Sequence, residues 1–269
     1  MLRRPSQAYI RCSQSGYTHA AKPDLKLVVL DLNGTLVWRP DRARSGHPPK
    51  LRPGLREFTR FLFANFAVMV WSSSTPNSVS TMCNAIFDDD QSNRLVAAWA
   101  RDTLGLTQQQ YRSKVQTYKN LDWLWENNHL RRIKQFSQRD TIIIDDGLEK
   151  VKQHPNNIIV IPEYDEALHR SRKDTALSTI TAYLTDLRTC TNVSAYIAEN
   201  HIQFAAVEEA AAAQVKDGAG GNAATEREAR RTRTRADEGV EEPDVLSKGQ
   251  KRNQRRAALL ARNEAASQQ

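Results

Sequence analysis

Short apolar runs of strand length alternate with longer segments of helical period between residues 25 and 187. A run of a few apolar residues bounded by turn residues is typical of a strand buried in a protein core. Five runs have this character, at residues 25–32, 67–71, 95–100, 141–144 and 157–161. The pattern therefore predicts five buried strands.

Segments with a helical spacing of apolar residues lie between these runs. They predict helices at residues 53–65, 77–87, 120–128, 147–153 and 174–188. Strands that alternate with helices in this way predict an α/β fold, a parallel sheet flanked by helices. Ligands of such sheets bind at the carboxyl ends of the strands. Asp31, Ser72 and Asp145, which lie at the carboxyl ends of predicted strands, are therefore the first candidates for a functional site.

The N-terminal segment, residues 1–23, contains basic residues, serines and threonines and no acidic residue before Asp24. This composition is typical of a mitochondrial transit peptide. An ordinary disordered basic N-terminus is the simpler interpretation, and we favour it because the segment has little hydrophobic periodicity.

The alternation of predicted strands and helices ends after the last predicted helix, so we expect the main domain at residues 24–190. Residues 191–216 are rich in alanine and predict a helical extension, whereas residues 217–269 have the composition of a disordered tail. A basic cluster at residues 246–256 could bind RNA or act as a nuclear address. A solvated basic end without a specific partner explains it equally well.

The amino-acid composition and net charge restrict the possible binding partners only partly. The chain of 269 residues has a formal net charge of +8 and a pI of about 9.5, which suits nucleic acid, a phosphoprotein or an anionic membrane surface. Its longest apolar stretch, residues 61–71, contains Asn65 and is shorter than the roughly 20 residues that span a bilayer. We therefore expect no integral membrane segment. The 3 cysteines form no CxxC pair, so a reducing compartment is expected.

The most informative motif is Leu-Val-Val-Leu-Asp-Leu-Asn-Gly-Thr-Leu at residues 27–36. Asn-Gly between apolar runs is also a strong β-hairpin signal, and the local pattern alone does not decide between a hairpin and a site. Other groups that phosphoryl transfer requires follow later strands. Their presence favours a site around Asp31.

Phosphoryl transfer to a carboxylate needs an oxygen nucleophile, a metal cation, a positive side chain and hydrogen-bond donors around the phosphate. Asp31 would be the nucleophile, because backbone amides of the next turn can bind phosphate there. Ser72 would donate its hydroxyl and Lys119 would neutralise charge. The pair Asp145 and Asp146 would supply the hard oxygen ligands that Mg²⁺ prefers.

Taken in order, these motifs resemble the haloacid dehalogenase superfamily. Within it they resemble the branch that contains the phosphatases of the RNA polymerase II C-terminal domain, the NLI-interacting-factor-like proteins and the presequence receptor of the mitochondrial inner-membrane import translocase. The resemblance leaves both tails unexplained. It rests on residues 31–35, 51–54, 70–72, 94–95, 118–121 and 142–146.

The resemblance implies a HAD-like fold and a role for each matching residue. Asp31 would be the phospho-acceptor and a magnesium ligand, and Asn33 would bind the metal through its backbone carbonyl. Asp146 would be the preferred ligand of the pair that it forms with Asp145. The phosphate-binding residues would be Gly34, Thr35, Ser72 and Lys119, with the Thr35 hydroxyl bracing the loop.

Asn33 departs from the family pattern, which usually has an aspartate here that protonates the leaving oxygen and then activates water. An amide can do neither, and losing such a group costs about 10²–10⁴ in rate, or roughly 3–5 kcal/mol of barrier. An aryl phosphate, whose leaving group needs no proton, would lose less. A neighbouring carboxylate such as that of Asp145 could replace the missing acid.

Three functions are consistent with these observations. The first is a magnesium-dependent phosphatase of phosphoserine or phosphothreonine in a nuclear or cytoplasmic phosphoprotein, with activity reduced by Asn33. The second is a non-catalytic mitochondrial protein that binds a presequence-like peptide, although the membrane anchor expected of an import receptor is missing. The third is an RNA-binding protein that acts through its basic tail.

Overall fold

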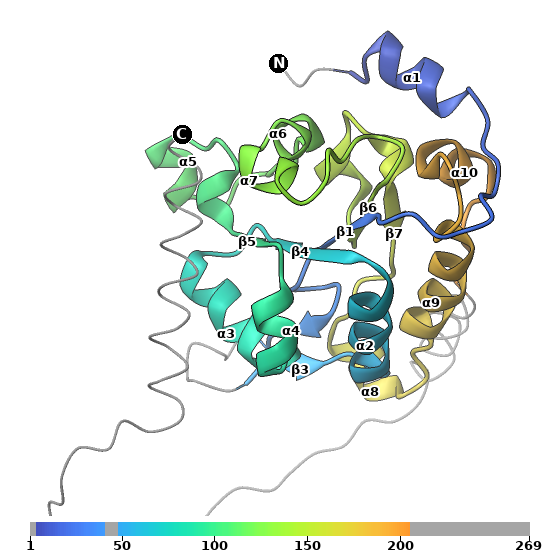
Figure 1. Cartoon of the computed structure of the whole chain (residues 1–269). Coiled ribbons are helices and arrows are strands. Elements are labelled where there is room, and N and C mark those ends of the chain that lie inside the picture. Colours follow the sequence, from blue (N-terminus) through green and yellow to red (C-terminus); the bar gives the residue numbers. More distant parts are fainter. Residues whose placement is uncertain (1–3, 41–47, 205–269) are drawn as a thin grey trace, which may run out of the picture. The chain divides into compact units, whose positions relative to one another are not determined.

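A central parallel sheet organises the part of the chain that the computed structural model describes, residues 4–40 and 48–204 (Figure 1). Its strand order is β5-β4-β1-β6-β7. This sheet confirms the predicted α/β fold, with strand ends that differ from the predicted ones by at most two residues. The strands are β1 (Leu27–Leu30), β4 (Ala67–Trp71), β5 (Ala97–Trp99), β6 (Thr141–Asp145) and β7 (Ile158–Val160).

Helices join the strands and cover both faces of the sheet (Figure 1). The two short strands β2 (Val37–Trp38) and β3 (Lys50–Leu51) form a separate antiparallel pair. The α-helices are α1 (Gln7–Ser13), α2 (Leu55–Asn65), α3 (Pro76–Ile86), α4 (Asp89–Arg94), α5 (Gln108–Arg112), α6 (Leu121–Trp125), α7 (Asn128–Arg131), α8 (Glu166–Ser171), α9 (Ala176–Leu187) and α10 (Val193–Glu199). The 3₁₀ turns are η2 (Arg101–Thr103), η3 (Leu148–Val151) and η4 (Pro155–Asn157).

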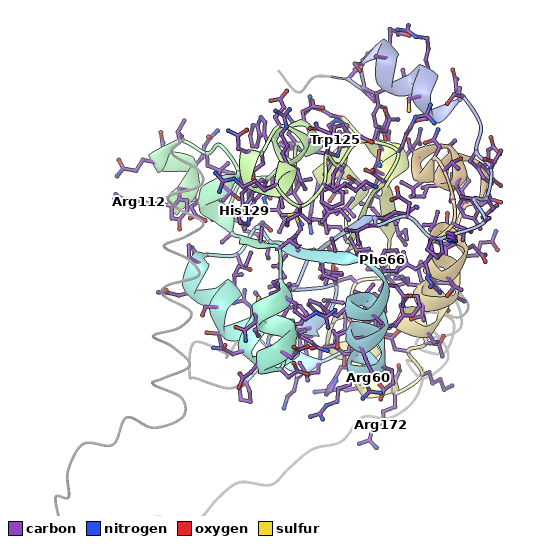
Figure 2. All side chains as sticks on the ribbon, viewed as in Figure 1. Arg60, Phe66, Arg112, Trp125, His129 and Arg172 are labelled. Atoms are coloured by element: carbon purple, nitrogen blue, oxygen red, sulfur yellow. The ribbon has the colours of Figure 1, made fainter. Side chains whose placement is uncertain are left out.

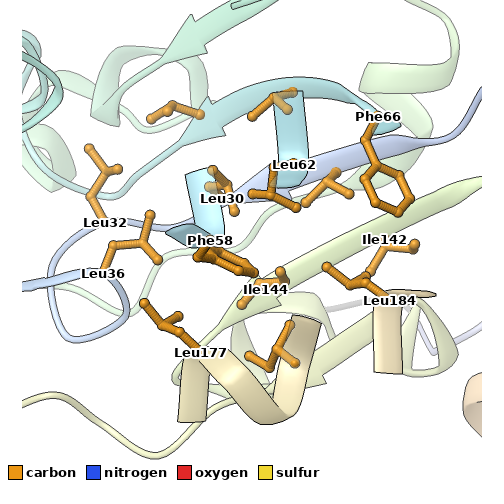
Figure 3. Close-up of a cluster of buried hydrophobic side chains, with 14 of the residues drawn as sticks. Leu30, Leu32, Leu36, Phe58, Leu62, Phe66, Ile142, Ile144, Leu177 and Leu184 are labelled. Atoms are coloured by element: carbon orange, nitrogen blue, oxygen red, sulfur yellow. The ribbon is translucent and has the colours of Figure 1, made fainter. Parts of the chain in front are cut away.

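Two hydrophobic cores result because successive side chains of a strand point to opposite faces of the sheet. On one face, Leu30 and Ile144 pack with Phe58 and Leu62 of α2 and with Leu177 of α9 (Figure 3). The alternate residues of β1 and β6 face a second cluster that includes residues of α6 and α7. The sheet is thus buried on both sides, as its unbroken apolar strands require.

The hairpin interpretation of Asn33 and Gly34 is wrong. β1 runs parallel to both of its neighbours, with Leu30 in register with Val70 of β4 and Ile144 of β6. Gly34 instead lies in a tight loop with φ of +86°, a conformation that glycine adopts without steric cost.

The predicted helix at residues 120–128 is two helices. The Asn127 side chain accepts hydrogen bonds from the backbone amides of His129 and Leu130 and so caps a new helix, α7. Residues 147–153 form the short turn η3 instead of a full helix. Of the predicted helical extension, α10 lies in the described part, whereas residues 205–216 and the predicted tail at 217–269 lie outside it.

The prediction of a disordered N-terminus is wrong for the described residues 4–23. Tyr9 of α1 is 5% exposed, and its hydroxyl donates to Oδ1 of Asn157 at 2.9 Å. The Ser13 hydroxyl lies 2.7 Å from that of Ser194 in α10. A helix this short is held by such packing and not by its own propensity, which explains why its sequence gives little signal. The transit-peptide interpretation stays a prediction.

A cleft of about 840 Å³ lies between α1 and α6, apart from the carboxyl ends of β1 and β4. His154 lines it and is buried edge-to-face against the rings of Tyr9 and Trp125, with ring centroids 5.1 and 4.9 Å away. Figure 2 labels Trp125 in this region. None of the described helices is both long enough and apolar enough to cross a membrane.

We predict that Tyr9→Ala lowers the free energy of unfolding by about 2–4 kcal/mol, because it empties a buried site and removes a buried hydrogen bond. Urea denaturation of the full chain measures the change. The exposed neighbour Gln7, replaced by Ala, is the matched control and should leave the value nearly unchanged. Equal stability of the two variants would contradict the role of α1.

His154 should make the fold sensitive to mild acid. Burial lowers the pKa of its imidazole, and Asp122, 3.2 Å away, only partly opposes this effect. The unfolded chain therefore takes up a proton first as pH falls below about 6.5, and stability decreases by at most about 1.4 kcal/mol per pH unit. Urea midpoints between about pH 7.5 and 5.5 should fall more steeply for the natural chain than for His154→Gln. Parallel curves would contradict this prediction.

Candidate active site

The carboxyl ends of β1, β4 and β6 bring the predicted site residues to one edge of the sheet. Asp31 directly follows β1, the central strand, and its backbone amide donates to the carbonyl of Ile144 at 3.0 Å. Ser72 directly follows the adjacent strand β4, and Asp145 is the last residue of β6. Asp31, Ser72 and Asp145 are at most 2% exposed. Polar groups buried this deeply need partners inside the protein.

Two lysines and three aspartates form a buried charge cluster. The Lys119 ammonium lies 2.9 Å from Oδ1 of Asp31 and 2.5 Å from Oδ2 of Asp145. The Lys150 ammonium lies 2.7 Å from Oδ1 of Asp145 and also pairs with Asp146. The backbone amide of Lys119 donates to the carbonyl of Lys150 at 2.7 Å, which holds the two lysines together. Each buried charge thus has an opposite charge beside it.

Sequence reasoning missed Lys150. It follows Asp146 by four residues, a spacing at which opposite charges can pair, and this was the only local signal.

The surroundings of Asp145 argue against the hypothesis that it replaces the missing acid. Burial alone would favour its neutral form, but Lys119 and Lys150 outweigh burial and hold the pKa of Asp145 well below its usual range. Asp145 therefore stays ionised and cannot donate the proton that Asn33 cannot supply.

The protonation of Asp31 reflects two opposing effects. Burial raises the pKa of the Asp31 carboxyl, and the adjacent Lys119 ammonium, which favours the carboxylate, offsets only part of that rise. Burial lowers the pKa of Lys119, but Asp145 and Asp31 outweigh it and raise that pKa overall. Burial and a hydrogen bond with Asp145 raise the pKa of Asp146 to about 7, against the influence of Lys150. Added positive charge beside Asp31 and Asp146 would favour their ionised forms.

The three carboxylates fit a divalent cation. One oxygen each from Asp31, Asp145 and Asp146 lies within 4.8 Å of the others. Such oxygens are the ligands of hard cations such as Mg²⁺. Asp145 is the most engaged of the three, because its two oxygens already accept from Lys119, Lys150 and the backbone amide of Gly147.

The loop after Asp31 is fixed from several sides. The Thr35 hydroxyl donates to Oδ2 of Asp31 at 3.4 Å. Arg52 donates to the Thr35 carbonyl at 2.8 Å and forms a buried ion pair with Asp174 at 2.6 Å. The backbone amide of Tyr164 donates to the Gly34 carbonyl at 2.6 Å. The loop that follows Asp31 is therefore held rigidly to the rest of the domain.

The phosphate-binding role of Gly34 and Thr35 stays a prediction. Their backbone amides donate inside the loop, to the carbonyls of Val37 and Leu32. Within the described part of the chain, the amides of Leu32 and Asn33 have no such acceptor. These two amides directly follow Asp31 and are the better donors to an anion.

Arg39 is a second residue that sequence reasoning missed, and nothing in the local pattern marks it. Its Nε donates to Oδ1 of Asn33 at 3.1 Å, and its Nη2 lies 3.5 Å from the hydroxyl of Ser74. The backbone amide of Ser74 in turn donates to the Ser72 hydroxyl at 3.4 Å. A guanidinium thus connects the loops that follow β1 and β4.

Comparison with known proteins shows the family to which the chain belongs. Residues 26–194 match the family model described as NLI interacting factor-like phosphatase. The chain belongs to this family. Membership confirms the resemblance to the polymerase-tail phosphatase branch and its HAD-like fold. An uncharacterized FCP1 homology domain-containing protein of Schizosaccharomyces pombe is 41% identical over 208 residues, which cover 73% of this chain and 84% of that protein.

More distant relatives carry explicit phosphatase names. Ubiquitin-like domain-containing CTD phosphatase 1 of Danio rerio is 23% identical over 166 residues, 62% of this chain and 51% of that protein. This family member therefore spans about half of the zebrafish protein. The solved structure of Fcp1, an essential RNA polymerase II CTD phosphatase, matches 65% of this chain and 70% of its own with 14% identity and a TM-score of 0.43.

We predict that Gly34→Ala destabilises the protein by about 1–3 kcal/mol more than Gly16→Ala. Both glycines have positive φ, +86° and +72°, so the backbone strain is similar. A Cβ at Gly34 would collide with the Asp146 carboxylate, whereas one at Gly16 would meet nothing within 4 Å. Urea denaturation of both variants isolates the collision. Equal losses would show that Asp146 does not pack against the loop.

Proposed function

We propose that this family member is a magnesium-dependent phosphatase that forms a phosphoryl-aspartate at Asp31 and turns over slowly because Asn33 occupies the position of the general acid. The observation that carries the proposal is the buried Asp31 carboxylate, paired with Lys119 at 2.9 Å and within 4.8 Å of oxygens from two further carboxylates. The substrate would be phosphoserine or phosphothreonine in a phosphoprotein of the nucleus or cytoplasm, in keeping with the phosphatase names of its relatives.

Each residue would have a defined part in the first step. A carboxylate oxygen of Asp31 forms a bond to phosphorus while the bond from phosphorus to the leaving oxygen breaks. Lys119 offsets the charge of the phosphoryl oxygens, and Ser72 with the amides of Leu32 and Asn33 donates to them. These donors are fixed before the substrate binds, so they cost no rearrangement in the transition state.

Mg²⁺, when bound, would offset further phosphoryl charge. Asp31, Asp146 and the backbone carbonyl of Asn33 would hold it. Asp145, although it lies in the same cluster, would serve mainly to hold Lys119 and Lys150, because both of its oxygens are already engaged.

The second step, hydrolysis of the phosphoryl-aspartate, lacks a catalytic base at Asn33. Water must attack the phosphoryl group on Asp31, and a base must take its proton. The Asn33 amide cannot act as that base, and its oxygen already accepts from Arg39. The phosphoryl-aspartate should therefore form more readily than it is hydrolysed.

Hydrolysis of an aryl phosphate and of a phosphoserine peptide by the full chain tests this proposal. We expect slow magnesium-dependent hydrolysis of the aryl phosphate, no hydrolysis by Asp31→Asn, and a gain of about 10²–10⁴-fold on the peptide in Asn33→Asp. The restored carboxylate explains the gain, because it supplies the missing acid and base. Equal rates for the natural chain and Asp31→Asn would contradict the proposal.

A non-catalytic binding protein is the second candidate, favoured by the amide at Asn33. It would keep the pocket and bind a phosphoprotein or, in a mitochondrion, a presequence-like peptide. Activity that appears only in Asn33→Asp would support it, because that result requires an intact pocket that lacks only the proton-transfer group. The proposed RNA contact of the basic tail involves residues outside the described part of the chain.

A further inference from the structure

Arg39 is a cation whose charge the described part of the chain does not neutralise. The two lysines of the site are both paired with aspartates. Arg39 instead contacts two neutral oxygens, those of Asn33 and Ser74, and pairs with no carboxylate among the described residues. A partly buried guanidinium without a counter-ion is favourably placed to meet an anion.

The position of Arg39 relates it to one part of the reaction. Asn33 stands where the family pattern has the acid that serves the leaving oxygen, and Nε of Arg39 lies 3.1 Å from its side chain. The second contact, to Ser74, ties the guanidinium to the loop that carries Ser72. Arg39 therefore lies beside the leaving-group position and between the loops after β1 and β4.

Arg39 also has N–H groups that donate to no described residue. A guanidinium carries five N–H groups, and only those on Nε and Nη2 have hydrogen-bond partners among the described residues. The group stays charged under all ordinary conditions, so it offers charge and hydrogen bonds but no transferable proton. This chemistry stabilises a developing anion without protonating it.

We propose that Arg39 binds the leaving oxygen of the substrate and stabilises its negative charge, so that this site selects phosphate esters whose leaving group departs as an anion. Aryl phosphates, including phosphotyrosine, form this class and would react faster than the phosphoserine or phosphothreonine of the proposed function, whose leaving oxygen needs a proton that this site does not supply. This inference rests on the proposed phosphatase function. As Asp31 bonds to phosphorus, the electron pair of the breaking bond passes to the leaving oxygen, which Arg39 holds until water protonates it.

A series of aryl phosphates with leaving groups of increasing pKa tests the proposal in the full chain. The slope of log kcat/KM against leaving-group pKa is compared for the natural chain, Arg39→Gln and Arg39→Lys. Arg39→Gln should lose about 10²-fold on the poorest leaving group and little on the best one, because charge on the oxygen is greatest in the former. Arg39→Lys keeps the charge and should lose less.

Arg60→Gln is the matched control. Arg60 is exposed on α2 and Figure 2 labels it on the outer side of that helix, so the same change of charge there should leave the slope unaltered. A uniform loss of kcat/KM across the series in Arg39→Gln would mean that Arg39 only orients Asn33. That result would overturn this inference and leave the proposed function standing. Hydrolysis that is equal in the natural chain and Asp31→Asn would overturn the proposed function and this inference together.

Discussion

The Lys119 ammonium, buried between the carboxylates of Asp31 and Asp145, is the interaction on which the site depends. A buried carboxylate without a positive partner would be protonated, and a protonated Asp31 is a poor nucleophile. Lys119 comes from the segment before α6, whereas the two aspartates end neighbouring strands. The charge cluster therefore forms only when the parallel sheet and its crossover segments are assembled, which couples the site to the fold.

The aspartates of the charge cluster differ in what their carboxylate oxygens contact. Asp145 and Lys150 neutralise and position charge, while Asp31 and Asp146 have the less engaged oxygens. The remaining position, at Asn33, contains an amide bonded to Arg39 instead of an acid. Under the proposed function, this site would keep the groups that bind a phosphoryl group and would lack the group that transfers protons. One fold could in this way retain a pocket and lose most of its turnover.

The sequence predicts the sheet well because its strands are buried on both faces and therefore unbroken in hydrophobicity, as at residues 67–71. It predicts Asp31, Ser72 and Asp145 because strand ends of a parallel sheet meet at one edge. It does not predict Lys150 or Arg39, whose roles depend on distant partners, nor α1, which is held mainly by Tyr9 and Ser13. It does not predict that the amides of Gly34 and Thr35 donate within their own loop, because loop hydrogen bonds cannot be read from residue types.

Mass spectrometry of the full chain, after incubation with Mg²⁺ and an aryl phosphate and a quench in acid that preserves acyl phosphates, tests directly whether Asp31 accepts a phosphoryl group. We expect one added phosphoryl group on the peptide that contains Asp31, because its formation needs no acid and its hydrolysis does need a base. The label should be absent from Asp31→Asn. A natural chain that remains unlabelled, or that carries the label on another residue, would contradict a phosphoryl-aspartate at Asp31.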